Sequence, residues 1–216
     1  MTKRLETVRR LMNRPDRWDF SDAETLYAGV DLGTWKAIVV VVDENGRPRA
    51  VSMRRAEAVR SGMILDYLGA LRVLREMLEE IRAASPLPVE LGATSYPPQT
   101  SSANVDTTTY ILEGVGLEVL NVLDEPTAAN RVLGLRDGVI VDVGGGTTGI
   151  AVMEKGRVIY TNDEATGGIH LSLVLAGHLG TSVEEADALK SDPRKNGDTL
   201  PIVKPVIEKM ASIVDT

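Results

Sequence analysis

The sequence predicts an α/β protein, because strand and helix patterns mix along the whole chain and a hairpin opens each half. Segments 26–53 and 139–160 follow the same order: strand, acid, glycine–threonine turn, strand, hairpin turn and strand. Between them, residues 67–84 carry apolar side chains at helical spacing. The repeat predicts two halves of similar fold, each with one turn suited to phosphate.

The composition excludes several kinds of functional site and disfavours some partners. The 216 residues contain 43% apolar residues and no cysteine, so disulfides, zinc–thiolate sites and cysteine nucleophiles are excluded. No apolar run approaches the roughly 20 residues of a membrane helix, and the start lacks the apolar core of a secretory signal. A net charge of −7 disfavours nucleic acid as a partner. We expect a cytoplasmic protein with no membrane insertion.

Residues 1–25 form a basic leader and a linker. Apolar residues recur at helical spacing in the first part, which predicts a short amphipathic helix that docks on a partner or remains a solvated end. Residues 15–25 are polar and acidic, as in a linker. The basic residues of the leader are Lys3, Arg4, Arg9, Arg10, Arg14 and Arg17.

The first half opens with a strand over 26–31 that ends in Asp31, followed by a tight turn and a β-branched return strand. The sequence Asp43-Glu-Asn-Gly46 is a strong hairpin signal before a third strand. Helix 67–84, strand 89–94, helix 101–113 and strand 117–123 follow. Asp124 and Glu125 end that strand, and Pro126 suits the first turn of a helix over 127–135.

The second half is organised around residues 139–153. Asp142 ends an apolar strand, and three glycines follow it. Glycines let the backbone turn sharply and approach a ligand, and successive N–H groups in such a turn make an anion cradle. Asp142 could hold a cation directly or through water. A plain glycine-rich hairpin without a ligand fits the same residues. Downstream, Gly167-Gly168 precede an apolar helix over 169–179, and Pro201 is expected to start the last helix.

Several familiar sites are excluded. The glycines of 144–149 match a dinucleotide fingerprint, but a strand follows where a helix is required. There is no Gly-Lys-Ser/Thr phosphate loop and no nucleophile elbow. His170 and His178 are eight residues apart in an apolar helix, which is poor spacing for a metal chelate. What remains is a constellation of three acidic strand ends and two glycine–threonine turns, which predicts magnesium–nucleotide binding between two lobes.

These residues resemble known motifs. Asp31-Leu-Gly-Thr34 and Asp142-Val-Gly-Gly-Gly-Thr147 resemble the two phosphate motifs of the actin, sugar-kinase and heat-shock-chaperone ATPases. The helix after Asp124 resembles their first connecting helix. Longer blocks resemble the EutJ family, chaperone-like proteins of ethanolamine-utilisation operons. These blocks are residues 58–66, 93–98, 122–128, 163–168 and 203–211.

The resemblance implies actin-like, ribonuclease H-like lobes, the first over 26–137 and a partial second over 138–216. It implies ATP and Mg²⁺ as ligands, with Asp31 and Asp142 orienting the metal. Glu125 would lie near the attacking water, and Thr147 would act beside it. The residues that the resemblance assigns to the nucleotide are Gly33, Thr34, Trp35, Gly144, Gly145, Gly146, Thr147, Thr148, Gly167 and Gly168.

Two departures from the pattern matter. The chaperone ATPases follow the glycines with Thr-Phe-Asp, whereas this chain has Thr147-Thr148-Gly149 and lacks that acid. We therefore expect nucleotide binding rather than efficient hydrolysis. The sequence also ends at Thr216, before the family's adenosine loop, so the second lobe would lack two strands. Weak, magnesium-dependent binding with poor base selectivity is the expectation.

Three functions follow from the resemblance. The first is a EutJ-like chaperone that assists assembly, protection or reactivation of ethanolamine ammonia-lyase, in or beside a bacterial microcompartment. The second is an actin-like filament subunit such as MreB, which shares a pattern near residue 60. The third is a small-molecule kinase of the same superfamily, for which no substrate-side acid can be placed.

Overall fold

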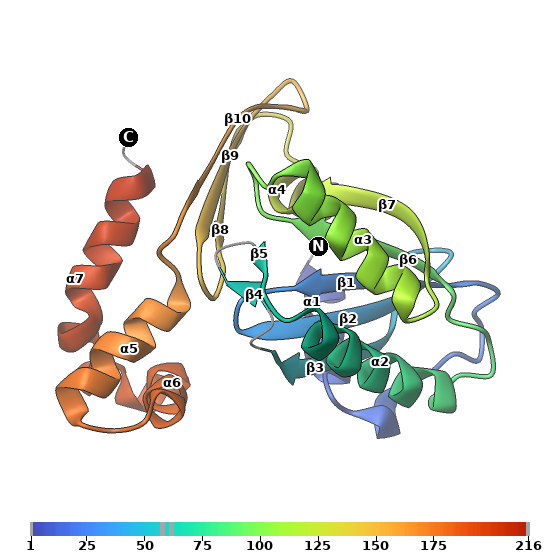
Figure 1. Ribbon diagram of the computed structural model, residues 1–216, viewed down its shortest axis with the longest axis horizontal. Helices are drawn as coiled ribbons and strands as arrows, with labels where there is room; N and C mark the ends of the chain where they lie inside the picture. The colour runs from blue at the N-terminus through green and yellow to red at the C-terminus, as the bar shows by residue number, and fades with distance from the viewer. Residues whose placement is uncertain (1, 57–58, 61–62, 215–216) are drawn as a thin grey trace. The chain divides into compact units, whose positions relative to one another are not determined.

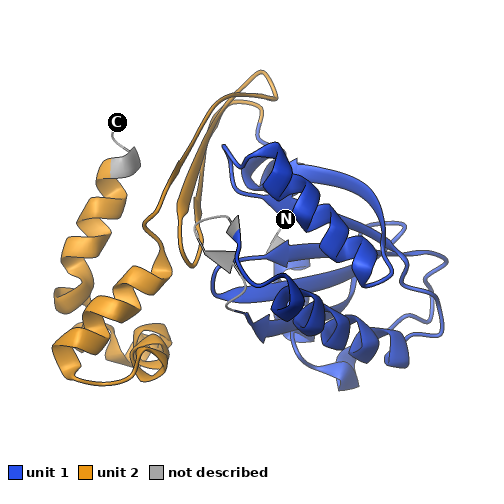
Figure 2. Ribbon diagram, viewed as in Figure 1, with its two compact units in different colours: residues 1–135 blue, residues 136–216 orange. Residues whose placement is uncertain are grey.

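The computed structural model describes residues 2–56, 59–60 and 63–214 (Figure 1). The chain separates into two compact units, residues 1–135 and 136–216 (Figure 2). Within the described residues, no helix is both long and apolar enough to cross a membrane. The mixture of sheets and helices confirms the predicted α/β class.

Unit 1 is built on a five-stranded sheet with the order β3-β2-β1-β6-β7. β1, β2 and β3 form an antiparallel meander, whereas β6 and β7 run parallel to β1. Parallel neighbours need crossover connections, and helices supply them here. The strands are β1 Leu26–Leu32, β2 Lys36–Asp43, β3 Pro48–Arg55, β6 Leu91–Tyr96 and β7 Glu118–Asp124.

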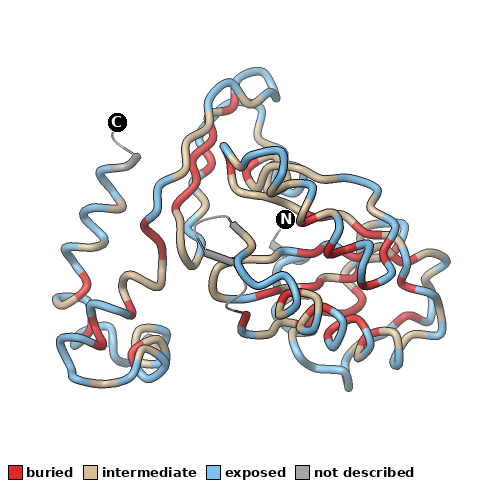
Figure 3. The backbone as a smooth tube through the Cα atoms, viewed as in Figure 1, coloured by how far each residue is buried: buried red, intermediate tan, exposed pale blue. Residues whose placement is uncertain are grey.

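Helices α2 (Tyr67–Ala84) and α3 (Ser102–Gly114) are the two crossovers, and both contribute to the core of unit 1 (Figure 1). α2 has the bounds that its apolar period predicts. Asp66 caps its first turn by accepting a hydrogen bond of 2.8 Å from the Gly69 N–H. The buried strands and inner helix faces form one aliphatic core, seen as the buried segments of Figure 3. Its fully buried members include Leu74, Leu78, Ile81, Val39, Val41, Ile111 and Leu112.

The basic leader is helical over α1 (Thr2–Leu11), and a short 3₁₀ turn, η1 (Pro15–Arg17), follows it. The segment after α1 attaches to strand β3: the Asn13 amide nitrogen Nδ2 donates to the Met53 oxygen at 3.0 Å, and the Met53 N–H donates to Asn13 Oδ1 at 2.7 Å. Phe20 is buried in the core of unit 1. Residues 2–25 therefore pack on the sheet.

Two small features complete unit 1. The two-residue strands β4 (Val59–Arg60) and β5 (Met63–Ile64) pair with each other; Ala58, Ser61 and Gly62 of the block over 58–66 lie outside the described residues. Helix α4 (Glu125–Leu133) has Pro126 in its first turn as predicted. It ends two residues early because Gly134, at φ 67°, takes the left-handed conformation that glycine favours.

Unit 2 has a three-stranded antiparallel sheet, order β10-β9-β8, and a group of helices. The strands are β8 Gly138–Val143, β9 Thr148–Glu154 and β10 Arg157–Glu164, and the helices are α5 Gly168–Leu179, α6 Val183–Ser191 and α7 Asn196–Val214, with a 3₁₀ turn η2 Pro193–Lys195. The helices share a small core around Leu175 and Val203. Ser182 and Glu185 form the predicted capping box of α6. The prediction that Pro201 starts the last helix is wrong. The helix begins at Asn196, and Pro201 lies inside it.

Candidate functional site

Two turns of the chain have the same backbone design. In loop 1 (residues 33–36), the Gly33 N–H donates to the Lys36 oxygen at 3.0 Å; in loop 2 (residues 144–147), the Gly144 N–H donates to the Thr147 oxygen at 2.9 Å. The flanking strands pair in matching register, Leu32 with Ala37 and Val143 with Thr148. The internal repeat predicted from the sequence is therefore present in the hairpins β1–β2 and β8–β9.

Each loop leaves two backbone donors at its tip. Among the described residues, the N–H groups of Thr34 and Trp35 in loop 1 and of Gly145 and Gly146 in loop 2 donate no backbone hydrogen bond. Consecutive N–H groups of this kind form concave sites for anions. The two loops thus offer equivalent pairs of donors to phosphate oxygens.

One acid precedes each loop at the same position of its strand. Asp31 pairs with Ile38 across β1–β2, and Asp142 pairs with Gly149 across β8–β9. Asp31 is exposed, whereas Asp142 is partly buried, and this burial raises the pKa of the Asp142 carboxyl. A nearby cation favours the charged form of a partly buried carboxylate. Among the described residues, no group of three or more histidine, aspartate or glutamate side chains forms a metal site by itself.

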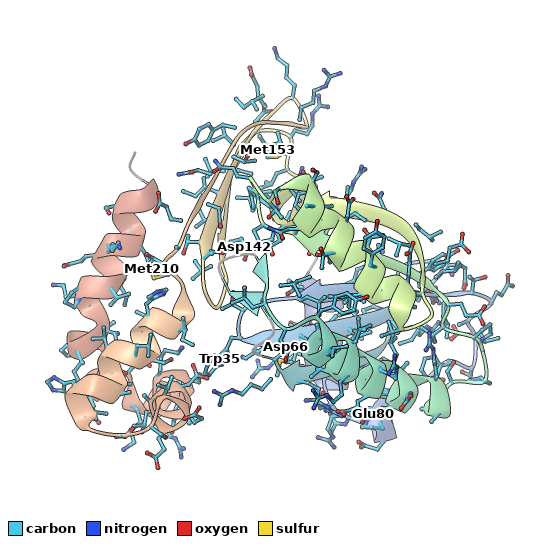
Figure 4. The ribbon with its side chains drawn as sticks, in the orientation of Figure 1. Trp35, Asp66, Glu80, Asp142, Met153 and Met210 are labelled. Atoms are coloured by element: carbon cyan, nitrogen blue, oxygen red, sulfur yellow. The ribbon has the colours of Figure 1, made fainter. Side chains whose placement is uncertain are left out.

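Loop 1 is supported by its own sheet. The Ala56 N–H donates to the Trp35 oxygen at 3.2 Å, and the Arg55 guanidinium carbon lies 4.1 Å from the centre of the Trp35 ring. Such a cation–π contact fixes the indole at the end of β3. Figure 4 labels Trp35 at this place. A Cβ atom on Gly33 would come within 3.1 Å of the Lys36 oxygen, so the turn is tight enough to favour glycine.

Loop 2 is supported by the start of helix α5. The Gly168 N–H donates to the Gly144 oxygen at 2.9 Å, and the Ile169 N–H donates to the Gly145 oxygen at 2.8 Å. These N–H groups belong to the first turn, where a helix has no internal acceptor for them. A Cβ on Gly167 would lie 2.7 Å from the Gly144 oxygen, so the backbone of Gly167 touches the loop. The pair Gly167-Gly168 therefore positions loop 2.

Glu125 is the first residue of α4, directly after β7. Asp124 caps this helix by accepting from the Thr127 N–H at 2.9 Å. Because β1, β6 and β7 are parallel, loop 1 and Glu125 follow strands that end at the same edge of the unit 1 sheet. Ligands of α/β proteins bind at this carboxyl edge. Unit 1 therefore brings Asp31, loop 1 and Glu125 to one edge.

Thr148 differs from its neighbours in the predicted set. Its side chain is buried, and its hydroxyl donates to the Thr166 oxygen at 2.6 Å. This bond ties β9 to the segment before α5. Burial raises the pKa of the Asp163 carboxyl on β10, and the nearby Thr147 hydroxyl opposes that shift.

Sequence reasoning missed two features of unit 2. Asp163 reaches loop 2 from β10, which only the strand register reveals. Lys190 on α6 donates to the Gly168 oxygen at 2.9 Å and to the Ser172 hydroxyl at 2.8 Å, and it forms an ion pair with Asp187. The i,i+3 spacing of Asp187 and Lys190 suggests the pair, but nothing in the sequence indicates its contact with α5.

Comparison with known proteins identifies the family. No protein-family model matches the sequence. The chain is 44% identical over 218 aligned residues to the ethanolamine utilization protein EutJ of Escherichia coli K12, and the alignment covers 99% of this chain and 74% of that protein. The chain belongs to the EutJ family. It is thus an ethanolamine utilization protein of the actin and heat-shock-chaperone ATPase superfamily, and the resemblance stated from the motifs is confirmed.

Solved structures agree with this assignment. The crystal structure of EutJ from Carboxydothermus hydrogenoformans has a TM-score of 0.88 and 42% identity to this chain, covering 97% of this chain and 78% of that one. MreB5 of Spiroplasma citri bound to ADP has a TM-score of 0.62 and 15% identity, covering 77% of this chain and 62% of that one. The predicted actin-like fold is therefore confirmed.

Proposed function

We propose that this EutJ-family chain binds ATP with Mg²⁺ through loop 1 and loop 2. The observation that carries the proposal is the repeated turn, with two unpaired backbone donors and one preceding acid in each copy. Backbone donors suit phosphate oxygens, and Mg²⁺ keeps several waters while taking few carboxylates. A related actin-like fold, MreB5 of Spiroplasma citri, is described as bound to ADP.

The residues of the two loops and their neighbours then have the following roles in binding the nucleotide. Asp31 and Asp142 orient the hydrated Mg²⁺, and when bound the metal neutralises phosphate charge. The N–H groups of both loops hold phosphate oxygens. Gly167 and Gly168 keep loop 2 in place. Thr147 lies beside the bound phosphates, and Thr148 supports loop 2 through its bond to Thr166.

Glu125 is assigned to the attacking water, as the superfamily resemblance implies. Its position at the start of α4 fixes its backbone, because Asp124 caps that helix. General-base catalysis contributes about 100- to 10,000-fold to a rate. We expect hydrolysis to be slow, because position 149 carries glycine where the chaperone ATPases have an acid.

Calorimetric titration tests nucleotide binding directly. The intact chain is titrated with ATP in the presence of Mg²⁺ and again with excess EDTA, and binding should require the metal. Asp142→Asn should weaken magnesium-dependent binding by about 10-fold or more. Glu154→Gln, an exposed acid at the far end of β9, is the matched control. The proposal is wrong if the unsubstituted chain gives no heat of binding with ATP, or if the heat is the same with Mg²⁺ and with EDTA.

The cellular role that we propose is chaperone-like. By its family, the chain would assist assembly, protection or reactivation of ethanolamine ammonia-lyase, or of the microcompartment that surrounds it, in the cytoplasm. The support is the membership in a family of ethanolamine utilization proteins and in the superfamily that contains heat-shock chaperones. Neither nucleic acid nor a membrane is a proposed partner.

Recovery of enzyme activity tests this role. Ethanolamine ammonia-lyase is inactivated and then incubated with this protein, with and without Mg·ATP. Recovery should be faster with the protein, and Asp142→Asn should remove the part that depends on ATP. Glu154→Gln should behave as the unsubstituted chain does. Equal recovery in the presence and absence of the protein would show that the lyase is not its client.

A further inference from the structure

Two carboxylates flank a glycine across the sheet of unit 2. Gly149 on β9 pairs with Asp142 on β8 and with Asp163 on β10. Directly opposed residues of antiparallel strands point to the same face of a sheet. Because Gly149 has no side chain, nothing from β9 separates the two acids. The negative charge of Asp142 reaches Asp163 and contributes, after burial, to raising the pKa of Asp163.

One oxygen of the Asp163 carboxyl lacks a hydrogen-bond partner among the described residues. The Thr147 hydroxyl of loop 2 is near this carboxyl and favours its charged form. Its Oδ1 atom is buried, and no hydrogen-bond partner for this atom exists within the described residues. A buried polar atom without a hydrogen-bond partner is destabilising, and more so when it is charged. Such an atom indicates a partner that the protein chain does not itself supply.

The surroundings indicate what the partner is. Asp163 lies on the same sheet face as Asp142, and its carboxyl is near the Thr147 hydroxyl. Thr147 belongs to loop 2, whose tip donors suit phosphate. Two carboxylates next to a polyphosphate are a donor set that a hydrated Mg²⁺ accepts, since this ion takes oxygen ligands and keeps several waters.

We propose that Asp163 is the second acid of loop 2 and, with Asp142, holds the hydrated divalent cation of the bound nucleotide. This inference rests on the proposed function, because it needs a magnesium nucleotide at loop 2. It also assigns Thr147 a positioning role: its hydroxyl favours the charged form of Asp163, whose Oδ1 atom is available to the metal's water shell. The acid absent at position 149 is thus supplied from the neighbouring strand.

The test compares binding with and without metal. The affinities of the intact chain, of Asp163→Asn and of Glu154→Gln are measured for ATP at saturating Mg²⁺ and in EDTA. Asparagine is isosteric with aspartate and removes only the charge. Asp163→Asn should therefore fold normally but lose about 10- to 100-fold in the affinity for Mg·ATP, with no loss in EDTA. Thermal unfolding of each variant checks the fold.

Mn²⁺ gives a second readout. Its electron paramagnetic resonance signal, recorded with the protein and ADP, reports bound metal independently of any turnover, and Asp163→Asn should leave more Mn²⁺ free. Adding Gly149→Asp to Asp163→Asn should restore metal-dependent binding, because the new carboxylate lies between the two strands. If the intact chain binds Mg·ATP and Asp163→Asn binds it equally well, the inference is wrong. If the intact chain binds no ATP, the proposed function itself fails.

Discussion

An alanine at position 167 would collide with loop 2. Its Cβ atom would lie 2.7 Å from the Gly144 oxygen and from the Thr147 nitrogen, and 2.8 Å from the Gly145 oxygen. Ordinary contacts of a Cβ atom lie at 3.4–4 Å. All three neighbours are backbone atoms, so either loop 2 or the start of α5 must move. Gly167 has an extended backbone, with φ −146°, so the conflict is one of space and not of backbone strain.

The displacement has two costs. Overpacking a tight site costs about 1–3 kcal/mol. The bonds from Gly168 to Gly144 and from Ile169 to Gly145 would lengthen, and each contributes about 0.5–1.5 kcal/mol. We expect Gly167→Ala to lower the free energy of unfolding of unit 2 by about 2–4 kcal/mol. For a unit of this size, each kcal/mol lowers the midpoint by about 4–8 °C.

Thermal unfolding followed by circular dichroism measures this loss, and titration with Mg·ATP measures its effect on loop 2. The matched control is Gly177→Ala, also on α5. No atom lies within 4 Å of a Cβ at Gly177, and alanine raises helix propensity there by about 1 kcal/mol. An unfolding midpoint and an affinity that both stay unchanged in Gly167→Ala would refute the claim that Gly167 holds loop 2.

Four further predictions test other parts of the fold and site. Arg49→Met removes the guanidinium that lies 2.6 Å from the buried Asp43 carboxylate, and urea unfolding should show a loss of about 3–5 kcal/mol; an unchanged midpoint would contradict it. Burial opposes ionisation of Asp43, but hydrogen bonds from two backbone N–H groups and from Arg49 lower its pKa below the usual value. Its stabilising contribution should therefore be complete above the unfolded pKa of about 3.9 and disappear as the pH falls through the lower folded pKa, which acid unfolding monitored by circular dichroism would show. Mg·ATP should change tryptophan fluorescence through Trp35, and Trp35→Phe should abolish the change; a persisting change would assign it to the other tryptophan. Asp124→Ala removes the acceptor of the Thr127 N–H at the start of α4, and urea unfolding should show a loss of about 1 kcal/mol. The same variant should slow ATP turnover more than it weakens ATP binding. Equal losses in turnover and in binding would count against a role for this cap in catalysis.

Local patterns explain why much of the fold could be predicted from sequence. Helix α2 has the predicted bounds because its apolar residues recur with the helical period and prolines follow it. The hairpin β2–β3 turns at Asp43-Glu-Asn-Gly46, where Gly46 has a φ of 69°. In both cases the sequence signal that predicts the element lies within a few neighbouring residues, and burial of the apolar side chains stabilises the same structure.

Features that depend on distant residues were not predictable. Asp163 lies on the second strand after loop 2 in sequence order, and only the pairing of β10 with β9 places it opposite Gly149, next to loop 2. The packing of residues 2–25 depends on Phe20 and on the hydrogen bonds between Asn13 and β3, although most residues of this segment are polar. Both contacts depend on which strands and segments pack together in three dimensions, and the local sequence does not give that information.

The two loops share one backbone design but differ in what holds them. Loop 1 is held by the end of β3, through the Trp35 oxygen and the Arg55 contact with its ring. Loop 2 is held by the first N–H groups of α5, and Lys190 of α6 bonds the Gly168 oxygen in that same turn. A shift of loop 2 therefore has to move α5 or break its first hydrogen bonds, whereas a shift of loop 1 stays within a strongly packed sheet. Because α5 also packs on α7, loop 2 is the loop whose position is linked to the helices of its unit.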